Sequence, residues 1–493
     1  MADASGAASV DEETRVMKTI NADVCVIGAG SAGLTAAGGA GALGRKTILI
    51  EAHKMGGDCL NFGCVPSKTL IASARVAHTM KDAARFGIEP VAEPKVDFLK
   101  VIARVQKVIA DIAYHDSEER MKEEFGVDTI RARANFVGPR EVIAGDVRVK
   151  AKHFVIATGS SAFIPPIPGL EGTGYLTNET VFSQTFQPKK LLVLGGGPIG
   201  AEMAQAHRLL GSDVTIIEKG RILGKDDPEL VDVVRKRLVA DGIDIREGTG
   251  ATAVRKQGDS FIVTVETEDG GTEEVSGDQL LVAVGRKANV DNLGLEAAGV
   301  EYDPRGIKVN EYLETSNSRI YAVGDVNGGL QFTHVAGAQG RIALNNILLK
   351  VLKKKFNPDI VPWVTYTEPE LAHVGLTESQ LKERGIKYEV ARAGFDHNDR
   401  AHAEGAPEGI LKIYVDGSGK IRGVDAVGIH AGEIIQQFAL AVSSGLKIGA
   451  FDDMIAPYPT LGEISKAAAD EYSFDKLFTP FNRAALKLLA MFD

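Results

Sequence analysis

Two segments of the chain carry the same order of apolar and polar positions. Each starts with a short apolar run, at residues 24–27 and 191–194, and continues into a loop rich in glycine. A stretch of small residues typical of a helix follows, and a second apolar run then ends on a glutamate, Glu51 or Glu218. Short apolar runs bounded by turn residues are typical of buried strands. Each segment therefore predicts a strand, a turn, a helix and a second strand.

The glycines have the same spacing in both segments. They are Gly28, Gly30 and Gly33 in the first segment and Gly195, Gly197 and Gly200 in the second. In a dinucleotide-binding turn the first glycine makes a tight bend, the second lets the backbone approach a pyrophosphate, and the third lets helix pack on strand. The terminal glutamate accepts hydrogen bonds from ribose hydroxyls. Two such units predict that the chain binds FAD and a nicotinamide and transfers electrons between them. The alternative is a pair of α/β turns that bind nothing.

Alternating apolar positions predict further strands. Phe261, Val263 and Val265 belong to a period-2 pattern over 250–284 that is typical of a β-meander, and a similar pattern occurs near 130–157.

The last part of the chain has a different character. From about residue 356 short strand-like runs precede a helix-like run at 432–446. Apolar positions over 479–492 recur at helical spacing, which indicates an amphipathic helix. We expect this helix to dock on the body of the protein or on a second copy. The alternative is contact with a membrane surface or another partner.

Composition narrows the class of protein. The 493 residues suffice for about three domains, and 25% charged and 44% hydrophobic residues are ordinary for a soluble globular chain. The net charge of −10 argues against nucleic acid as a partner, because proteins that bind it usually carry a basic stripe. No apolar run is long enough for a transmembrane helix, and residues 1–19 lack the apolar segment of a signal peptide. We therefore expect a cytoplasmic protein with a flexible tail over 1–19.

The chain has only three cysteines, too few for a disulfide scaffold. Cys59 and Cys64 lie five residues apart, a spacing that fits neither a zinc ribbon nor a C-x-x-C redox motif. A disulfide between them needs a distorted helical turn, which Asn61 and Gly63 allow. Cytosolic disulfides are usually catalytic or redox-sensing, and two reduced core thiols are the alternative. Cys25 lies within the first apolar run and is expected to be an inert buried thiol.

The order of these motifs resembles the class I flavoprotein disulfide reductases, a family that includes lipoamide dehydrogenase, glutathione reductase and mercuric reductase. The resemblance extends over residues 22–480. Besides the two glycine loops, the matching segments are GGDCLNFGCVPSK at 56–68, Ala157-Thr158-Gly159, Glu202 after the second loop, Val284-Gly285-Arg286, and TSNSRIYAVGD at 315–325.

The resemblance implies roles for individual residues. Cys59 would be the thiol that meets the substrate and Cys64 the thiol beside the flavin, while Lys68 would lie near flavin N5 and pair with Glu202. Asp325 would hold the FAD ribityl chain, with Glu51 on the adenosine ribose. The full set of expected cofactor-binding residues is Gly28, Gly30, Gly33, Glu51, Lys68, Thr158, Gly159, Asp325, Gly195, Gly197, Gly200, Glu218 and Gly285.

The resemblance also implies an α/β fold with two Rossmann-type dinucleotide-binding domains and an α+β C-terminal dimerisation domain. The FAD-binding domain would be split over 20–160 and 286–355, with the NAD-binding domain at 161–285 and the dimerisation domain at 356–493. We expect a homodimer in which the C-terminal segment of one subunit completes the active site of the other.

Glu218 bears on the choice of nicotinamide. A carboxylate at this position would repel the 2′-phosphate of NADPH, whereas NADP sites usually place an arginine nearby. Lys219 and Arg221 follow closely and can still contact a phosphate. The sequence favours NADH.

The chain departs from the family at the C-terminal site. Most members read H-P-T-x-x-E, a His–Glu pair that shuttles protons, whereas this chain has Tyr458 in the histidine position and keeps Glu463. Forming a phenolate at pH 7 costs about 4 kcal/mol, so Tyr458 is a poor general base although a usable proton donor. A packing role is the alternative. Tyrosine here resembles the mercuric reductase branch, but no cysteine follows Cys64, so the C-terminal cysteine pair that delivers Hg(II) in that branch is missing.

These observations predict an FAD-dependent NAD(P)H oxidoreductase with a redox-active Cys59–Cys64 disulfide, similar to mercuric reductase. Electrons would pass from NADH to a small-molecule disulfide, a lipoyl group or a thiophilic metal ion. One alternative is a dihydrolipoyl dehydrogenase, and another is a redox-sensing or scaffolding flavoprotein without turnover. No resident metal is expected. The expected catalytic residues are Cys59, Cys64, Lys68, Glu202, Tyr458 and Glu463.

Overall fold

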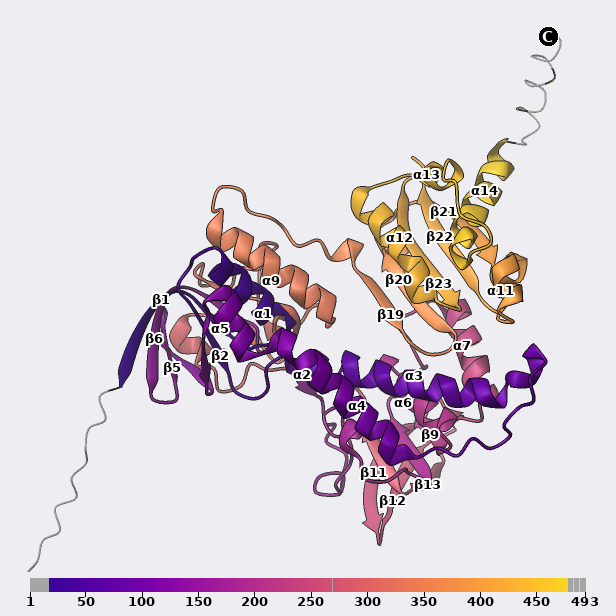
Figure 1. Ribbon diagram of the computed structural model, residues 1–493, viewed down its shortest axis with the longest axis horizontal. Coiled ribbons are helices and arrows are strands. Elements are labelled where there is room, and N and C mark those ends of the chain that lie inside the picture. Colours follow the sequence, from indigo (N-terminus) through magenta and orange to yellow (C-terminus); the bar gives the residue numbers. More distant parts are fainter. Residues whose placement is uncertain (1–16, 268, 478–481, 483–486, 488–493) are drawn as a thin grey trace, which may run out of the picture.

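A computed structural model of the protein contains three groups of strands and helices, and the second group is inserted in the chain between two parts of the first (Figure 1). The structure describes residues 17–267, 269–477, 482 and 487. The predicted C-terminal helix over 479–492, apart from residues 482 and 487, and most of the predicted tail therefore lie outside the described residues. No helix in the described part of the chain is long and apolar enough to cross a membrane.

The first group contains a seven-stranded sheet. Six of its strands lie within residues 18–156, and the seventh, at 320–322, comes from a later part of the chain. Its order is β3-β2-β1-β6-β5-β4, and β18 pairs with the last residues of β6. β1, β2, β3, β6 and β18 run parallel, whereas β4, β5 and β6 form an antiparallel meander. The strands are β1 Lys18–Ile27, β2 Thr47–Glu51, β3 Asp128–Arg131, β4 Ala134–Gly138, β5 Glu141–Ala144, β6 Val147–Ile156 and β18 Ile320–Ala322.

The strand β1 starts earlier than predicted. Lys18 and Thr19, expected to belong to the tail, already pair with Val147 and Arg148 of β6. The first half of β1 is largely exposed and polar, so the apolar pattern reveals only its buried half. The ten-residue β6 supplies the backbone partners that extend the strand.

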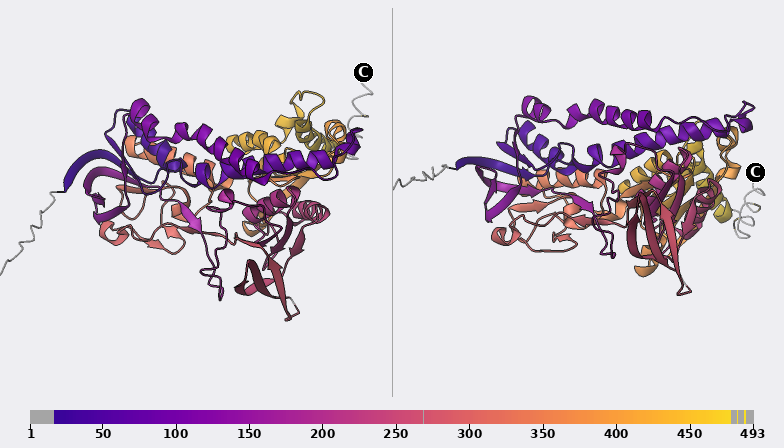
Figure 2. Two further views of the ribbon diagram at one scale, coloured as in Figure 1. Left: turned by 60° about the horizontal axis from the view of Figure 1, so that its bottom comes forward. Right: turned by 90° about the horizontal axis from the view of Figure 1, so that it is seen from below.

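Helices cover the first sheet and connect it to the other groups. α1 (Ser31–Ala42) packs against α9 (Thr333–Leu348), which lies far away in sequence. α2 (Gly57–Asn61) leads into α3 (Cys64–Lys81), and Figure 2 shows α3 and α4 (Phe98–Ala113) running side by side along one edge of the molecule. The shorter elements of the chain are α5 Glu118–Phe125, α8 Leu295–Ala298, β16 Tyr302–Asp303, β17 Gly306–Ile307, α10 Glu378–Glu383, α11 Asp399–Ala403 and α13 Gly449–Asp452.

The second group contains the second glycine unit. Its parallel sheet has the order β10-β9-β8-β14, and the meander predicted from Phe261, Val263 and Val265 is present with all three residues buried. β7 and β15 pair antiparallel where the chain enters and leaves this group, next to the expected boundaries at residues 160 and 286. The elements are β7 Ser160–Ala162, β8 Lys190–Leu194, α6 Pro198–Leu209, β9 Asp213–Ile217, α7 Pro228–Ala240, β10 Asp244–Arg246, β11 Gly250–Gln257, β12 Ser260–Glu266, β13 Thr272–Gly277, β14 Gln279–Val282 and β15 Arg286–Ala288.

The third group is a five-stranded antiparallel sheet of order β19-β20-β23-β22-β21. The helix α7 of the second group contacts β20 and β23, and it lies between the two groups in Figure 1. The elements are β19 Pro362–Thr365, β20 Glu370–Gly375, β21 Tyr388–Gly394, β22 Ile410–Asp416, β23 Ile421–Gly428, α12 Ala431–Ser444 and α14 Ile464–Leu477.

The packing of strand, turn and helix requires the first and third glycines of each unit. A Cβ atom at Gly33 would lie 1.8 Å from the carbonyl oxygen of Gly28, and one at Gly200 would lie 1.9 Å from that of Gly195. Gly28 and Gly195 also have φ values of +105° and +102°, which other residues rarely adopt. The two units fold alike because the same close contacts recur in both.

We expect Gly200→Ala to destabilise the protein, because its methyl group would force α6 away from the preceding turn. Overpacking of this kind costs about 1–3 kcal/mol, and thermal unfolding of the holoenzyme should show a melting temperature several degrees lower. Gly197→Ala is the matched control, since its Cβ atom would meet no atom within 4 Å. Equal melting temperatures for the two variants would contradict the packing role of Gly200.

Candidate functional site

A cavity of about 2570 Å³ lies where the three groups of elements meet, and residues from all three line it. Both glycine loops open into it, together with the cysteine segment at α2–α3 and the start of α9. Every expected cofactor-binding residue lines this cavity except Gly33 and Gly200, the two glycines that the packing of the fold itself requires. The sequence therefore identified residues that converge on one site.

The cysteine pair lies at a break between two helices. Cys59 is in α2, the helix ends at Asn61, and Cys64 is the first residue of α3. Gly63 connects the two with φ −123° and ψ −112°, which is the distortion that a five-residue spacing needs. Both cysteines carry free thiols, and Cys64 faces the cavity with its Sγ 3.4 Å from Thr333 Oγ1.

The two thiols differ in acidity. A hydrogen bond from Cys59, together with Thr333 and the charge of Lys68, lowers the pKa of Cys64 to about 6 against the opposing effect of burial. The same hydrogen bond raises the pKa of Cys59, and burial raises it further. The pair therefore holds one thiolate, at Cys64, and one thiol, at Cys59. Burial alone raises the pKa of Cys25, which is fully buried in β1 and away from the cavity.

Lys68 and Glu202 form an ion pair beside the cysteines. Lys68 Nζ lies 2.7 Å from Glu202 Oε2, and Glu202 is buried. The other oxygen of Glu202 accepts a hydrogen bond of 2.9 Å from the backbone N–H of Tyr366. Lys68 Nζ also lies 4.3 Å from the centre of the Tyr366 ring, close enough for a cation–π interaction. Tyr366 could not be predicted as a site residue from the sequence, because its partners lie more than 160 residues away.

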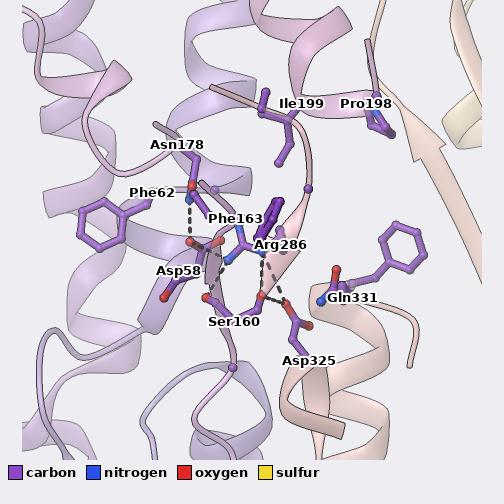
Figure 3. Close-up of a pocket in the computed structure, with 18 of the residues that line it drawn as sticks. Asp58, Phe62, Ser160, Phe163, Asn178, Pro198, Ile199, Arg286, Asp325 and Gln331 are labelled. Atoms are coloured by element: carbon purple, nitrogen blue, oxygen red, sulfur yellow. Dashed lines mark hydrogen bonds and ion pairs between the residues drawn. The ribbon is translucent and has the colours of Figure 1, made fainter. Parts of the chain in front are cut away.

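Asp325 takes part in a polar network that the sequence indicated only in part (Figure 3). Its carboxylate accepts a hydrogen bond of 2.6 Å from Ser160 Oγ, which in turn accepts one of 2.7 Å from Arg286 Nε. Arg286 also lies 3.2 Å from Asp58, and Asn178 donates to that same carboxylate at 2.8 Å. Burial raises the pKa of Asp325. Arg286 and Asp58 lie in matching segments of the sequence but were given no role, whereas Ser160 and Asn178 were not predicted.

The terminal glutamates of the two glycine units make equivalent hydrogen bonds. Glu51 accepts from the backbone N–H groups of Ala29 and His53, both at 2.6 Å. Glu218 accepts from the N–H groups of Gly196 and Gly220 at 2.6 and 2.7 Å. These donors occupy corresponding positions in the two repeats. Each carboxylate is therefore held at the mouth of its glycine loop.

The middle glycines fit a bound dinucleotide. A Cβ atom at Gly30 would have its nearest neighbour 3.9 Å away, and one at Gly197 would have none within 4 Å. Packing within the protein therefore does not require glycine at either position. A Cβ atom there would instead project into the cavity, in the space where a pyrophosphate approaches the N-terminus of the helix.

Tyr458 and Glu463 lie apart from the cavity of their own chain, since neither is among its lining residues. Tyr458 is 68% exposed, and its hydroxyl donates a hydrogen bond of 2.7 Å to Asp399. This bond and the nearby charge of Glu463 raise the pKa of Tyr458, so the phenol stays protonated at neutral pH. Asp399 was not predicted as a site residue, because a single acid in a polar loop carries no signal of its own.

Among the residues that the structure describes, no group of three or more histidine, cysteine, aspartate or glutamate side chains is placed to hold a metal ion.

Comparisons with known proteins place this geometry in a family. The family model for pyridine nucleotide-disulphide oxidoreductases matches residues 22–340, and the model for the dimerisation domain of these proteins matches residues 361–469. A mercuric reductase of Lysinibacillus sphaericus is 37% identical over 468 residues, covering 94% of this chain and 85% of that protein. A dihydrolipoyl dehydrogenase of Thermus scotoductus is 38% identical over 465 residues, covering 92% of this chain and 97% of that protein.

A solved structure has the same overall fold. It is the Cu(II) complex of the HOCl-induced flavoprotein disulfide reductase RclA from Escherichia coli, with a TM-score of 0.81 and 26% identity over 92% of this chain and 99% of that one. The expected fold class and family are confirmed. The chain thus belongs to the pyridine nucleotide-disulphide oxidoreductases, the FAD-containing enzymes that use NAD(P)H.

Proposed function

We propose that the protein uses NADH to reduce a Cys59–Cys64 disulfide, and that the dithiol passes two electrons to a disulfide or a thiophilic metal ion. The observation that carries this proposal is the arrangement of Cys59, Cys64, Lys68 and Glu202 on one wall of the cavity. When bound, FAD supplies the two-electron carrier between the nicotinamide and the cysteine pair. The protein supplies the groups that hold the cofactors and set the charge on the thiols.

The residues at the two glycine loops support the choice of cofactors. Gly30 and Glu51 would hold the pyrophosphate and adenosine ribose of FAD, with Asp325 on the ribityl chain. Gly197 and Glu218 would hold the nicotinamide dinucleotide. Two backbone N–H groups keep the Glu218 carboxylate in place, where it accepts the 2′-hydroxyl of NADH and repels the 2′-phosphate of NADPH.

The different acidities of the two thiols support different roles for Cys59 and Cys64. Cys64 is held as a thiolate by the hydrogen bond from Cys59 and by the Lys68 charge. Cys59 keeps its proton at rest. It would react with the acceptor once that proton has been removed. The intact Lys68–Glu202 pair argues against a purely scaffolding role, which has no need of a partly buried charge beside a thiolate. A redox sensor needs a stabilised thiolate as well, so reduction by NADH is what separates turnover from sensing.

The C-terminal site supports an acceptor that needs little proton transfer. Tyr458 remains protonated, so it cannot take the proton that oxidation of a dithiol releases. Reduction of a metal ion held by thiolates requires less proton transfer than oxidation of a dithiol. A thiophilic metal ion agrees with the mercuric reductase relative and with the Cu(II) complex of RclA. A lipoyl group is the second candidate, which the dihydrolipoyl dehydrogenase relative and the retained Glu463 favour.

The proposal includes a homodimer in the cytoplasm. The dimerisation domain at residues 361–469 and the position of Tyr458 outside the cavity of its own chain support a site that the partner subunit completes. A reducing compartment keeps the cysteine pair from being trapped as a permanent disulfide.

An acceptor screen tests this function directly. Purified holoenzyme is assayed with NADH and with NADPH against Hg(II), Cu(II), lipoamide and glutathione disulfide. We expect NADH to be preferred and a thiophilic metal ion to be reduced faster than lipoamide. A preference for NADPH would contradict the role of Glu218, and failure of NADH to reduce the protein would contradict turnover altogether.

The acidity of Cys64 yields a pH dependence. Its thiolate should form as the pH rises through about 6, so the long-wavelength absorbance band of a thiolate beside oxidised flavin should grow through that midpoint in two-electron-reduced enzyme. Lys68→Gln should move the midpoint upward by up to about 1 unit, because a nearby cation favours the thiolate. Lys81→Gln, at the exposed end of the same helix, is the matched control. A midpoint near 8.5, the value of an ordinary thiol, or a band in Cys64→Ser would contradict the assignment.

The residue at position 458 should decide dithiol chemistry. Tyr458→His would place a base with a pKa near neutral beside Asp399, and general base catalysis is typically worth about 10²–10⁴-fold. We therefore expect dihydrolipoamide oxidation at neutral pH to rise by about 10²-fold, with little change in flavin reduction by NADH. Tyr458→Phe, which lacks the hydroxyl, should show no gain. A folded Tyr458→His variant without faster dithiol oxidation would show that another feature limits the reaction.

A further inference from the structure

An ionic network with a buried Lys412–Asp227 pair joins the second group of elements to the C-terminal sheet. Lys412 of β22 is 5% exposed, and its ammonium group lies 2.9 and 3.0 Å from the two carboxylate oxygens of Asp227. It also lies 2.5 Å from Glu229, to which Arg392 of β21 donates two further hydrogen bonds. The acids belong to the start of α7, and both cations belong to the C-terminal sheet.

Asp227 is the centre of this network. Besides Lys412, its carboxylate accepts hydrogen bonds from the backbone N–H groups of Glu229 and Leu230 and so caps the first turn of α7. The Tyr414 hydroxyl lies 3.3 Å from it and donates its single proton in the shorter hydrogen bond, of 2.7 Å, to Asp425. The position of Asp227 is therefore fixed by donors from its own helix and from β22.

The preceding residue, Asp226, is held by a different strand. Its carboxylate accepts a hydrogen bond of 2.8 Å from the indole N–H of Trp363 in β19. The Trp363 ring stacks on His373 of β20 with ring centres 3.9 Å apart. His373 Nδ1 forms a hydrogen bond of 2.5 Å with the carboxylate of Asp425. Two consecutive residues of the second group are thus fixed by two separate contacts with the C-terminal sheet.

The segment that ends at these two residues lines the site proposed for the nicotinamide dinucleotide. It follows Glu218, and Lys219, Arg221 and Lys225 all face the main cavity. Its middle residue, Leu223, is buried with a φ of +49° and donates a hydrogen bond of 2.9 Å to the carbonyl of Gly196 in the glycine loop. A buried leucine with positive φ persists only where its surroundings hold it.

We propose that Lys412 and Trp363 are positioning residues for the pyridine nucleotide. By fixing Asp227 and Asp226, they hold the segment 219–227 in the conformation that receives the adenosine half of the dinucleotide next to Glu218. The inference rests on the dinucleotide site proposed above. Stability alone explains the network poorly, because removing a buried ion pair from water can cost more than the pairing returns. Lys412 lies outside the main cavity, so its effect on the dinucleotide acts through the segment, whereas Trp363 and Asp226 line the cavity themselves.

The test uses FAD-loaded enzyme and two ligands, NAD⁺ and ADP-ribose, the second of which lacks the nicotinamide. The main variant is Lys412→Met with Asp227→Asn, which removes both charges and leaves an amide to cap α7. The second is Trp363→Phe, which removes the N–H donor and part of the ring but keeps an aromatic ring on His373. Arg255→Met is the matched control, because Arg255 forms an exposed ion pair with Glu274 in the meander of the same group.

We expect both network variants to raise the Kd of ADP-ribose about 5-fold or more by calorimetry, the size of a typical coupling between linked elements. Amide hydrogen exchange should become faster in peptides that cover 219–230, whereas Arg255→Met should change neither quantity. The reactivity of Cys64 toward an alkylating agent should stay unchanged in the double variant and in Arg255→Met, because neither Lys412 nor Asp227 lines the cavity that holds the cysteines.

An unchanged Kd in the folded double variant, with or without faster exchange over 219–230, would overturn the inference. If that variant does not fold, an unchanged Kd in Trp363→Phe would do the same. Failure of the unmodified enzyme to bind NAD⁺ or ADP-ribose would overturn the proposed function and this inference together. The two failures can be told apart, because failure of the proposed function abolishes binding in the unmodified enzyme, whereas the inference concerns weaker binding in the variants alone.

Discussion

The Lys68–Glu202 ion pair is the interaction on which the site depends, because it joins all three groups of elements at the cysteine wall. Lys68 comes from α3, Glu202 from α6, and Tyr366, which donates its N–H to Glu202 and places its ring beside Lys68, from the segment between β19 and β20. Removing one partner of a buried pair leaves an uncompensated charge, at a cost of about 3–5 kcal/mol when both are buried and less here, because Lys68 is partly exposed. The cation that lowers the pKa of Cys64 is therefore held in place only when the three groups are assembled.

The two glycine units line much of the rest of the cavity, and both are held together by the same hydrogen bonds and close contacts. In each unit a glutamate at the end of the second strand binds backbone N–H groups of the loop, and a glycine at the third position lets the helix touch the turn. Only the middle glycine has no reason within the protein to lack a side chain. The units differ in what surrounds them: the first opens toward Asp325 and Cys64, and the second is bordered by the segment that Trp363 and Lys412 hold from the C-terminal sheet.

Features that depend on local order could be predicted from the sequence. The glycine spacing predicted both strand–turn–helix units, and the five-residue step between Cys59 and Cys64 correctly required a break in the helix. The start of β1 was predicted too late, because Lys18 and Thr19 are held by backbone pairing with β6 and carry no apolar signal. Tyr366, Ser160, Asp399 and the Asp227–Lys412 pair were missed for a different reason. Each acts through a partner far away in sequence, such as 59 residues for Asp399 and Tyr458 and 185 for Asp227 and Lys412, and a single polar residue gives no sign of such a partner.

The central claim is that electrons from NADH reach the acceptor through Cys59 and Cys64. The most direct measurement is alkylation of the cysteines of oxidised holoenzyme without oxygen, before and after one equivalent of NADH, with the labelled sites identified by mass spectrometry. The account predicts that Cys59 and Cys64 are protected before NADH and become labelled after it, while the buried Cys25 stays unlabelled throughout. Labelling of Cys59 and Cys64 that is the same with and without NADH would contradict it.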